Sequence, residues 1–576
     1  MGSVALHHEQ RSLIWGIIFY LFFGFVLMAF FAPTGSAPLP ALRYETDGFR
    51  VPEGRIMGRH SAGHSFLKAF VQASCGELSI TGVGALAKTG EAFAQDVRAF
   101  DPNLTAQFIH LNDQRAIAQK GQMHLADPSL SIHAHLRQSV GPAAYSLTGV
   151  THTISSMGAM GLIADLFTAP VMPWDGLICT SDPVKQSVET LMEAQKDYLR
   201  WRFGSSIAFE GPQLATIPLG VDCASFAGFS EIQPSARAAL GLAPDDVVFL
   251  FLGRLSFHAK AHPLLMYLGL EEVAQKLKRK LVLIQCGWFA NEFIENAFRD
   301  GAARFAPSVR HIFLDGRQDE MRKVAWSACD VFISLSDNIQ ETFGLTLIEA
   351  MAAGKPVIAT DWDGYRQTAR HGETGFMVPT LMPERFGEDL ALSHAAGSIT
   401  YDQYLAQASG LVSLDLRALR EAIEQLVGAP HLRKRMGLAG QRRAQTLFDW
   451  SVILRDYQKF WAELEERRMQ AVREAPPRPA TQLDPGLLFA TYPTQSINGS
   501  SRFVRRENGS DGQEIARHSL FGAAAVNANW IAAVLQKMSG EPVSLQELTG
   551  QLAWSERDHV IEAVSQLMKM GLVERV

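Results

Sequence analysis

The chain has 576 residues, too many for one hydrophobic core, and this length predicts about three or four domains. Its 47% of hydrophobic and 19% of charged residues are typical of a globular protein, and a net charge of −6 argues against nucleic acid as a partner. The five cysteines form no CxxC pair and are odd in number, which predicts reduced thiols rather than disulfides or a zinc site.

The first predicted element is an uncharged stretch of 20 residues, Leu13–Ala32, which is long enough to span a membrane. One arginine precedes it and three follow within residues 43–55, which favours a body in the cytoplasm, attached to the inner face of the membrane. We therefore interpret residues 1–40 as a candidate anchor. The alternative is a misassigned start, with Met28 or Met57 as the first residue.

Residues 41–236 are predicted to form a Rossmann-like domain, although the pattern of strands and helices is less regular here than further along the chain. The run Arg55–Met57 is a poor candidate for a first strand, so the entry into this sheet is not predicted. The later strand candidates are Thr105–His110, Tyr145–His152, Gly176–Thr180 and Leu214–Pro218.

Residues 237–446 are predicted to form a second Rossmann-like domain, because short apolar runs alternate with helical stretches as in a parallel sheet covered on both faces. The two domains would face a cleft. The predicted strands are Val247–Leu252, Leu281–Cys286, His311–Leu314, Val331–Leu335, Pro356–Thr360 and Phe376–Val378.

Two basic residues, Arg254 and Lys260, follow the first of these strands. Ligands of doubly wound sheets bind at the carboxyl edge of the strands, so these side chains are candidates for binding an anion such as a diphosphate. The alternative is that both are solvated loop charges.

The most informative window is Glu341–Glu349, with the sequence ETFGLTLIE. Gly344 would precede a helix whose free N–H groups and dipole favour an anion, and Glu349 would lie roughly 7 Å along that helix. A carboxylate at that distance suits the two hydroxyls of a ribose. The alternative is that Glu341 and Glu349 are two solvated acids.

The C-terminal part is predicted in three pieces. Residues 447–470 form an amphipathic crossover helix that returns to the N-terminal domain, and residues 471–515 form a linker rich in Pro, Gly and Ser. Residues 516–576 resemble a mainly helical, winged-helix-like domain. Six acids against three bases in Glu541–Arg575 favour protein contact over DNA binding.

Four motifs in order resemble family 4 of the retaining glycosyltransferases, also called group 1, with the GT-B fold. The resemblance covers about residues 55–470. The motifs read GRLSFHAK, FLDGR, SLSDNIQETFGLTLIEAMAAGKPVIATDWDGY and GETGFMVP, and begin at Gly253, Phe313, Ser334 and Gly372.

The resemblance implies roles for the donor side of a site. Arg254 and Lys260 would hold the donor diphosphate, Glu341 would contact the sugar hydroxyls, and Glu349 would bind the ribose. The remaining residues implied at the nucleotide sugar are Phe343, Gly344 and Leu345 with their backbone amides, and Gly316 and Arg317 along the base.

The resemblance also implies two features of the N-terminal domain. His152 would face the donor sugar near the reacting carbon, and Gly58–Gly63 would be the family's glycine-rich loop, with Gly63 at the ligand. The alternatives are a structural histidine and a plain helix-capping turn.

The chain departs from the family pattern at several places. Arg254 and Lys260 stand six positions apart instead of five, and Leu219 replaces the usual Asn. Asp363 and Gly364 replace a Gly-Gly pair, and the long stretch Thr380–Leu411 would cover the cleft.

The predicted activity is transfer of a hexose from a UDP- or GDP-sugar to a saccharide or lipid-linked acceptor, with retention and without cofactor or metal. The leaving diphosphate would accept the acceptor's proton, and no Asp-x-Asp motif indicates a metal. The alternatives are a non-catalytic GT-B scaffold, whose C-terminal domain contacts proteins, and a disaccharide or disaccharide-phosphate synthase.

Overall fold

A computed structural model of the chain describes residues 39–51, 58–74, 79–206, 208–472, 477, 479–506, 520, 528–538 and 540–576. These residues belong to two compact units, 1–477 and 478–576. The stretch expected as a membrane anchor lies outside the described residues. Within the described ranges, no helix is long and apolar enough to cross a membrane.

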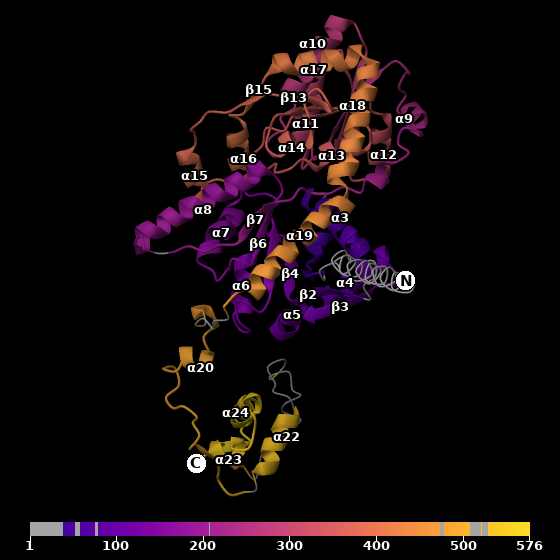
Figure 1. Cartoon of the computed structure of the whole chain (residues 1–576). Helices are drawn as coiled ribbons and strands as arrows, with labels where there is room; N and C mark the ends of the chain where they lie inside the picture. The colour runs from indigo at the N-terminus through magenta and orange to yellow at the C-terminus, as the bar shows by residue number, and fades with distance from the viewer. Residues whose placement is uncertain are drawn as a thin grey trace, which may run out of the picture. The chain divides into compact units, whose positions relative to one another are not determined.

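The N-terminal domain is built on a seven-stranded parallel sheet with the order β3-β2-β1-β4-β5-β6-β7 (Figure 1). The chain enters at β1, upstream of the run Arg55–Met57 that we considered for a first strand. This strand has only three residues, so no apolar run could reveal it. The strands are β1 (Ala41–Arg43), β2 (Ser79–Gly84), β3 (Thr105–His110), β4 (Gln122–Leu125), β5 (Ser146–Val150), β6 (Gly176–Cys179) and β7 (Gln213–Thr216).

Helices cover both faces of this sheet, and two apolar clusters fill the space between helices and strands. Beneath one face, Arg137 and Asp175 form an ion pair that is fully buried. The helices are α2 (Thr46–Phe49), α3 (Gly58–Ala73), α4 (Ala87–Phe100), α5 (Gln114–Lys120), α6 (Leu130–Arg137), α7 (Met157–Ala164) and α8 (Asp182–Phe203).

The second domain holds a six-stranded parallel sheet with the order β10-β9-β8-β11-β12-β13, the doubly wound arrangement expected from the alternating apolar runs. Every predicted strand of this domain is present. The strands are β8 (Val247–Leu252), β9 (Leu281–Gly287), β10 (Arg310–Asp315), β11 (Val331–Ser334), β12 (Val357–Thr360) and β13 (Gly375–Val378).

The helices of the second domain likewise cover two faces, each with its own apolar cluster. An insertion of two short strands and two helices interrupts this pattern after β13. The helices are α9 (Gln233–Ala239), α10 (Leu264–Leu277), α11 (Glu292–Phe305), α12 (Asp319–Ala328), α13 (Leu345–Ala352), α14 (Tyr365–Thr368), α17 (Leu416–Gly428) and α18 (Pro430–Arg443). The insertion contains β14 (Thr380–Leu381), α15 (Glu388–Ala395), α16 (Tyr401–Ser409) and β15 (Ser413–Leu414).

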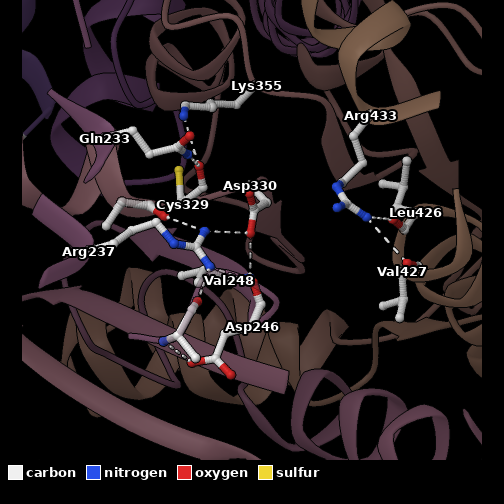
Figure 2. A network of polar contacts seen from close by, with 12 residues as sticks. Gln233, Arg237, Asp246, Val248, Cys329, Asp330, Lys355, Leu426, Val427 and Arg433 are labelled. Atoms are coloured by element: carbon white, nitrogen blue, oxygen red, sulfur yellow. Dashed lines mark hydrogen bonds and ion pairs between the residues drawn. The ribbon is translucent and has the colours of Figure 1, made fainter. Parts of the chain in front are cut away.

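A polar network fastens α9 to the start of the second sheet (Figure 2). Arg237 pairs with Asp330 at 3.1 Å, and Asp330 also accepts the backbone N–H of Val248 at 2.9 Å. Lys355 donates to the Cys329 carbonyl at 2.8 Å. These bonds satisfy charged groups that are largely withdrawn from water, so the network positions the domain rather than a ligand.

The last helix of the larger unit, α19 (Trp450–Met469), packs in the core of the N-terminal domain. The indole N–H of Trp461 donates to Thr148 at 3.1 Å, and Gln122 donates to the Trp461 carbonyl at 2.6 Å. The chain thus leaves the second domain and returns to the first, which ties the two sheets into one unit.

In the described part of the smaller unit, helices pack on a three-stranded antiparallel sheet in the order β17-β16-β18. Residues 502–505, which we expected in a linker, form β16, because the fully buried Phe503 joins the core of this unit. The elements are β16 (Arg502–Arg505), α22 (Ala528–Lys537), β17 (Val543–Ser544), α23 (Leu545–Thr549), α24 (Trp554–Lys569) and β18 (Val573–Arg575), preceded by the short α20 (Pro485–Leu488).

Candidate functional site

Three neighbouring strands of the second sheet end in glycines that lie against one another. A Cβ on Gly287, at the end of β9, would lie 1.9 Å from the Gly253 carbonyl oxygen, and one on Gly316, after β10, 2.8 Å from Gly287 Cα. The three strand ends therefore approach one another so closely that a side chain at Gly287 or Gly316 would not fit. We had predicted Gly316 but not Gly287, although a glycine directly after an apolar run is a signal for it.

Arg254 follows Gly253 at this edge, in the loop that leads to α10. One guanidinium nitrogen, Nη2, donates to the Ala259 carbonyl at 3.0 Å. Burial lowers the pKa of Arg254, while the negative charges of Asp402 and Glu341 oppose that shift. The guanidinium is thus partly desolvated and close to two carboxylates, and a phosphate could replace either as its partner.

Lys260 forms an ion pair with Glu341, 81 positions further along the chain. Burial raises the pKa of Glu341, but the Lys260 ammonium and the backbone amides of Gly344 and Phe343 outweigh burial, so the pKa lies below its ordinary value. The predicted residues Lys260 and Glu341 therefore meet. Phe343 contributes only its amide, since its side chain is buried against Phe448.

The helix after this turn, α13, begins at Leu345, as the sequence predicts. Gly344 has φ +85°, and a Cβ there would lie 2.0 Å from the ring of Tyr365. The glycine is therefore required by the backbone and by Tyr365. In the first turn, the buried Thr346 hydroxyl has no hydrogen-bond partner within the described structure. Sequence reasoning missed Thr346, because one threonine in a helix has no distinctive pattern.

Glu349 lies further along α13 and is partly buried. Burial raises its pKa to about 7, and the positive charges of Arg322 and Lys260 act against that rise. Arg322 also donates to the Gly316 carbonyl at 2.6 Å, which links the end of β10 to the surroundings of Glu349. The exposed Arg317 instead pairs with the half-buried Asp315 at 2.8 Å.

On the N-terminal domain, His152 follows β5, the strand that was predicted to present it. Burial lowers its pKa, and a hydrogen bond to the Ala126 carbonyl opposes that shift. His152 is therefore neutral near pH 7. Its neighbours Thr153 and Ser155 contact Tyr401 of the insertion, at 3.3 and 2.7 Å between hydroxyl oxygens. His152 thus lies on the side of its domain that faces the second domain.

The structure corrects the conformation expected for Gly58–Gly63, because these residues form the first turns of α3 instead of a loop. A Cβ on Gly63 would lie 1.8 Å from the Gly48 carbonyl oxygen, so close packing of α3 on α2 requires this glycine. A glycine needed for helix packing cannot be distinguished in sequence from one that binds a ligand.

The two domains also touch next to Glu341. Ser181, at the start of α8, donates to the Thr342 carbonyl at 3.0 Å and to Asp363 at 3.2 Å. Asp363, which replaces a family glycine, adopts φ +43°, a strained conformation for a residue with a side chain. Over the described part of the chain, no group of three or more His, Cys, Asp or Glu side chains is arranged to hold a metal ion.

Comparison with known proteins finds a family match in the second domain. Residues 232–393 match the family model of group 1 glycosyl transferases. The chain is 30% identical over 243 residues to the phosphatidyl-myo-inositol mannosyltransferase of Mycobacterium tuberculosis, which covers 42% of this chain and 52% of that protein. The Mycobacterium leprae protein of that name is 27% identical over 341 residues, or 58% and 70% of the two chains.

The first of these matches spans only about half of its relative. Among solved structures, Anabaena HepE with UDP-glucose superposes with a TM-score of 0.44 and 15% identity, over 74% of this chain and 99% of that one. Two doubly wound domains joined by a returning helix form the GT-B architecture. The chain thus has the GT-B fold, and its residues 232–393 match the family model of group 1 glycosyl transferases.

Proposed function

We propose that this protein transfers a hexose from a nucleoside diphosphate sugar to an acceptor hydroxyl, with retention at the anomeric carbon. The observation that carries this proposal is the convergence of Lys260 and the Phe343 and Gly344 amides on the Glu341 carboxylate, with Arg254 close by. These groups surround an anion at the edge of the sheet where doubly wound domains bind ligands.

In the proposed complex the donor diphosphate takes over the positive partners that Glu341 has in the free protein. Arg254 and Lys260 then bind phosphate oxygens, and Glu341, released from the ion pair, accepts hydrogen bonds from the sugar hydroxyls. The first turn of α13 adds its free N–H groups and the Thr346 hydroxyl. Glu349 binds the ribose, and Gly316 and Arg317 lie along the base.

The proposed reaction needs no nucleophile from the protein. The acceptor oxygen forms a bond to the anomeric carbon on the face from which the diphosphate leaves, and its proton passes to that diphosphate. Arg254 and Lys260 stabilise the charge that develops there, which is how a fixed electrostatic environment lowers a barrier. His152, neutral near pH 7, can hydrogen-bond to the sugar without adding charge.

The acceptor is proposed to be a saccharide or a lipid-linked group. The support comes from the two mycobacterial relatives, which are named as mannosyltransferases that act on phosphatidyl-myo-inositol, an inositol lipid. The proposed donor is a UDP- or GDP-sugar.

A panel of UDP- and GDP-sugars tests the proposal directly. One of them should raise the melting temperature of the full chain and be slowly hydrolysed, because a ligand that binds only the folded state stabilises it. Stabilisation without any turnover would favour a non-catalytic scaffold. If no nucleotide sugar stabilises the protein or is cleaved, the proposed function is wrong.

The affinity for the donor should depend on pH through Glu349. Its carboxyl has a pKa of about 7, so the carboxylate that accepts the ribose hydroxyls forms as the pH rises through that value. Donor affinity should therefore increase from pH 6 to pH 8. Glu349→Gln should weaken binding at pH 8 by roughly tenfold and flatten this pH dependence. Calorimetric titration over this range measures both effects.

The Glu349 carboxyl should affect the stability of the fold in the opposite direction, so that its contribution falls as the pH rises. The raised pKa of Glu349 means that the folded protein binds this proton more tightly than the unfolded chain. Its contribution to the free energy of unfolding is therefore largest below the unfolded pKa, and falls as the pH rises towards 7. Glu349→Gln should remove this fall. Glu424→Gln, at a carboxylate paired with Lys276 on the surface, is the matched control and should change neither property.

A further inference from the structure

The insertion of the second domain leaves the fold and returns to it through a short stem. β14 and β15 pair in antiparallel fashion, with Thr380 opposite Leu414, and the Asp415 N–H donates to the Pro379 carbonyl at 2.9 Å. Between them lie α15 and α16, which pack on each other (Figure 1). The rings of His394 and Tyr404 are stacked 4.1 Å apart. The insertion is therefore an ordered pair of helices that is joined to the second domain through the short β14–β15 sheet.

One residue of this insertion reaches the N-terminal domain. The Tyr401 hydroxyl lies 2.7 Å from Ser155 Oγ and 3.3 Å from Thr153 Oγ1, and these two oxygens are themselves 3.1 Å apart. Tyr401 is the first residue of α16, whose start is fixed by a capping box between Thr400 and Gln403. Three hydroxyls thus connect the insertion to the segment directly after His152.

The next residue faces the opposite way, towards the basic loop of the second domain. Asp402 lies 3.9 Å from His258 Nε2, and its charge acts on the Arg254 guanidinium. The first turn of α16 therefore stands between the His152 segment and the Arg254 loop. Those two segments are where the proposed function places the donor sugar and its diphosphate.

We propose that the insertion, residues 380–414, is a lid over the donor site, and that Tyr401 is the positioning residue that holds the lid on the N-terminal domain. This inference rests on the proposed function. The consequence of the closed lid is selectivity for the acceptor over water. When water replaces the acceptor, its oxygen bonds to the anomeric carbon, the bond to the diphosphate breaks, and the proton passes to the diphosphate.

Tyr401→Phe in the full chain tests the lid, because it removes one hydroxyl and keeps the ring. It should raise the ratio of donor hydrolysis to transfer by roughly fivefold, the factor that corresponds to about 1 kcal/mol for one hydrogen bond. It should also speed hydrogen exchange of the α16 amides, a readout that needs no turnover. Ser155→Ala should act in the same direction but more weakly, because the Tyr401 hydroxyl keeps its contact with Thr153. The double variant should add little to Tyr401→Phe, which already removes the contact with Ser155.

The matched control is Tyr404→Phe, one turn further along α16. Its ring stacks on His394, and within the described residues no hydrogen bond to its hydroxyl is present. Tyr404→Phe should match the wild type in both measurements. The lid is refuted if Tyr401→Phe leaves the product ratio and the exchange rate unchanged, or if Tyr404→Phe alters them equally.

The failure of the lid is distinguishable from failure of the proposed function. If the wild type cleaves a nucleotide sugar and needs Arg254, but Tyr401→Phe behaves as wild type, only the lid is wrong. If no nucleotide sugar is bound or cleaved, the proposed function fails and the lid's role at a donor site fails with it. Hydrogen exchange then still decides whether Tyr401 fastens the insertion.

Discussion

Arg254→Ala is expected to lower kcat/KM for sugar transfer by about 10²–10³-fold, the usual effect of removing one preorganised group that stabilises a developing negative charge. Arg254 lies at the carboxyl edge of the second sheet, partly desolvated and near the charges of Glu341 and Asp402. Lys260, the other cation of the loop, is already paired with Glu341 in the free protein. The guanidinium is therefore the group best placed to bind the leaving diphosphate in two places at once.

Steady-state kinetics on the purified variant measure this effect, and thermal unfolding shows whether the fold is intact. The melting temperature should change little, because the guanidinium gives up hydration in the fold and donates a hydrogen bond only to the Ala259 carbonyl among the described residues. Arg420→Ala is the matched control: this exposed arginine pairs with Glu272 on α10, and its loss should not alter kinetics. Arg254→Ala with a wild-type rate would overturn the assignment.

Asp175→Ala is expected to lower the free energy of unfolding by about 3–5 kcal/mol, the range for removing one partner of a buried ion pair. Both carboxylate oxygens accept from Arg137, at 2.6 and 2.7 Å, and they also accept the backbone N–H groups of Leu147 and Met172, each at 2.8 Å. The substitution would leave a guanidinium charge without its partner in the N-terminal core.

Denaturant unfolding, followed by a spectroscopic signal from the larger unit, measures this change in the free energy of unfolding. Asp300→Ala is the control, because Asp300 pairs with Arg304 on the surface of α11 and such pairs contribute little. The double variant Arg137→Met with Asp175→Leu should recover part of the loss, since it removes both charges together. A stability equal to that of the wild type in Asp175→Ala would show that the pair does not support the domain.

Sequence patterns predicted the second domain better than the first. Strands such as Val247–Leu252 are buried on both faces, so they appear as apolar runs that need no tertiary information. β1 contains Arg43, whose side chain reaches out to Glu45, and three residues are too few to show any period. For the same reason β16 was hidden in a segment that resembles a linker, since only the packing of Phe503 makes it a strand.

The candidate site likewise has features that sequence patterns predict and features that they do not. The motif around Glu341 identified the turn, the helix start and both glutamates, because helix caps and strand ends are local properties with local signals. The sequence could not distinguish Gly63, which packs on α2, from a glycine that binds a ligand. Nor could it show that Gly344 is needed for Tyr365 as well as for its positive φ.

The order of elements in the second domain and the residue types of the proposed donor side could be predicted without the structure, since both follow from short-range periodicity and motif chemistry. The tertiary structure alone decided which of those groups meet. Lys260 pairs with Glu341 across 81 positions, and Tyr401 meets Ser155 across 246. The first contact arises because β8 and β11 are neighbours in one sheet, and the second because the insertion of the second domain packs on the first domain. No local pattern of residues records either arrangement.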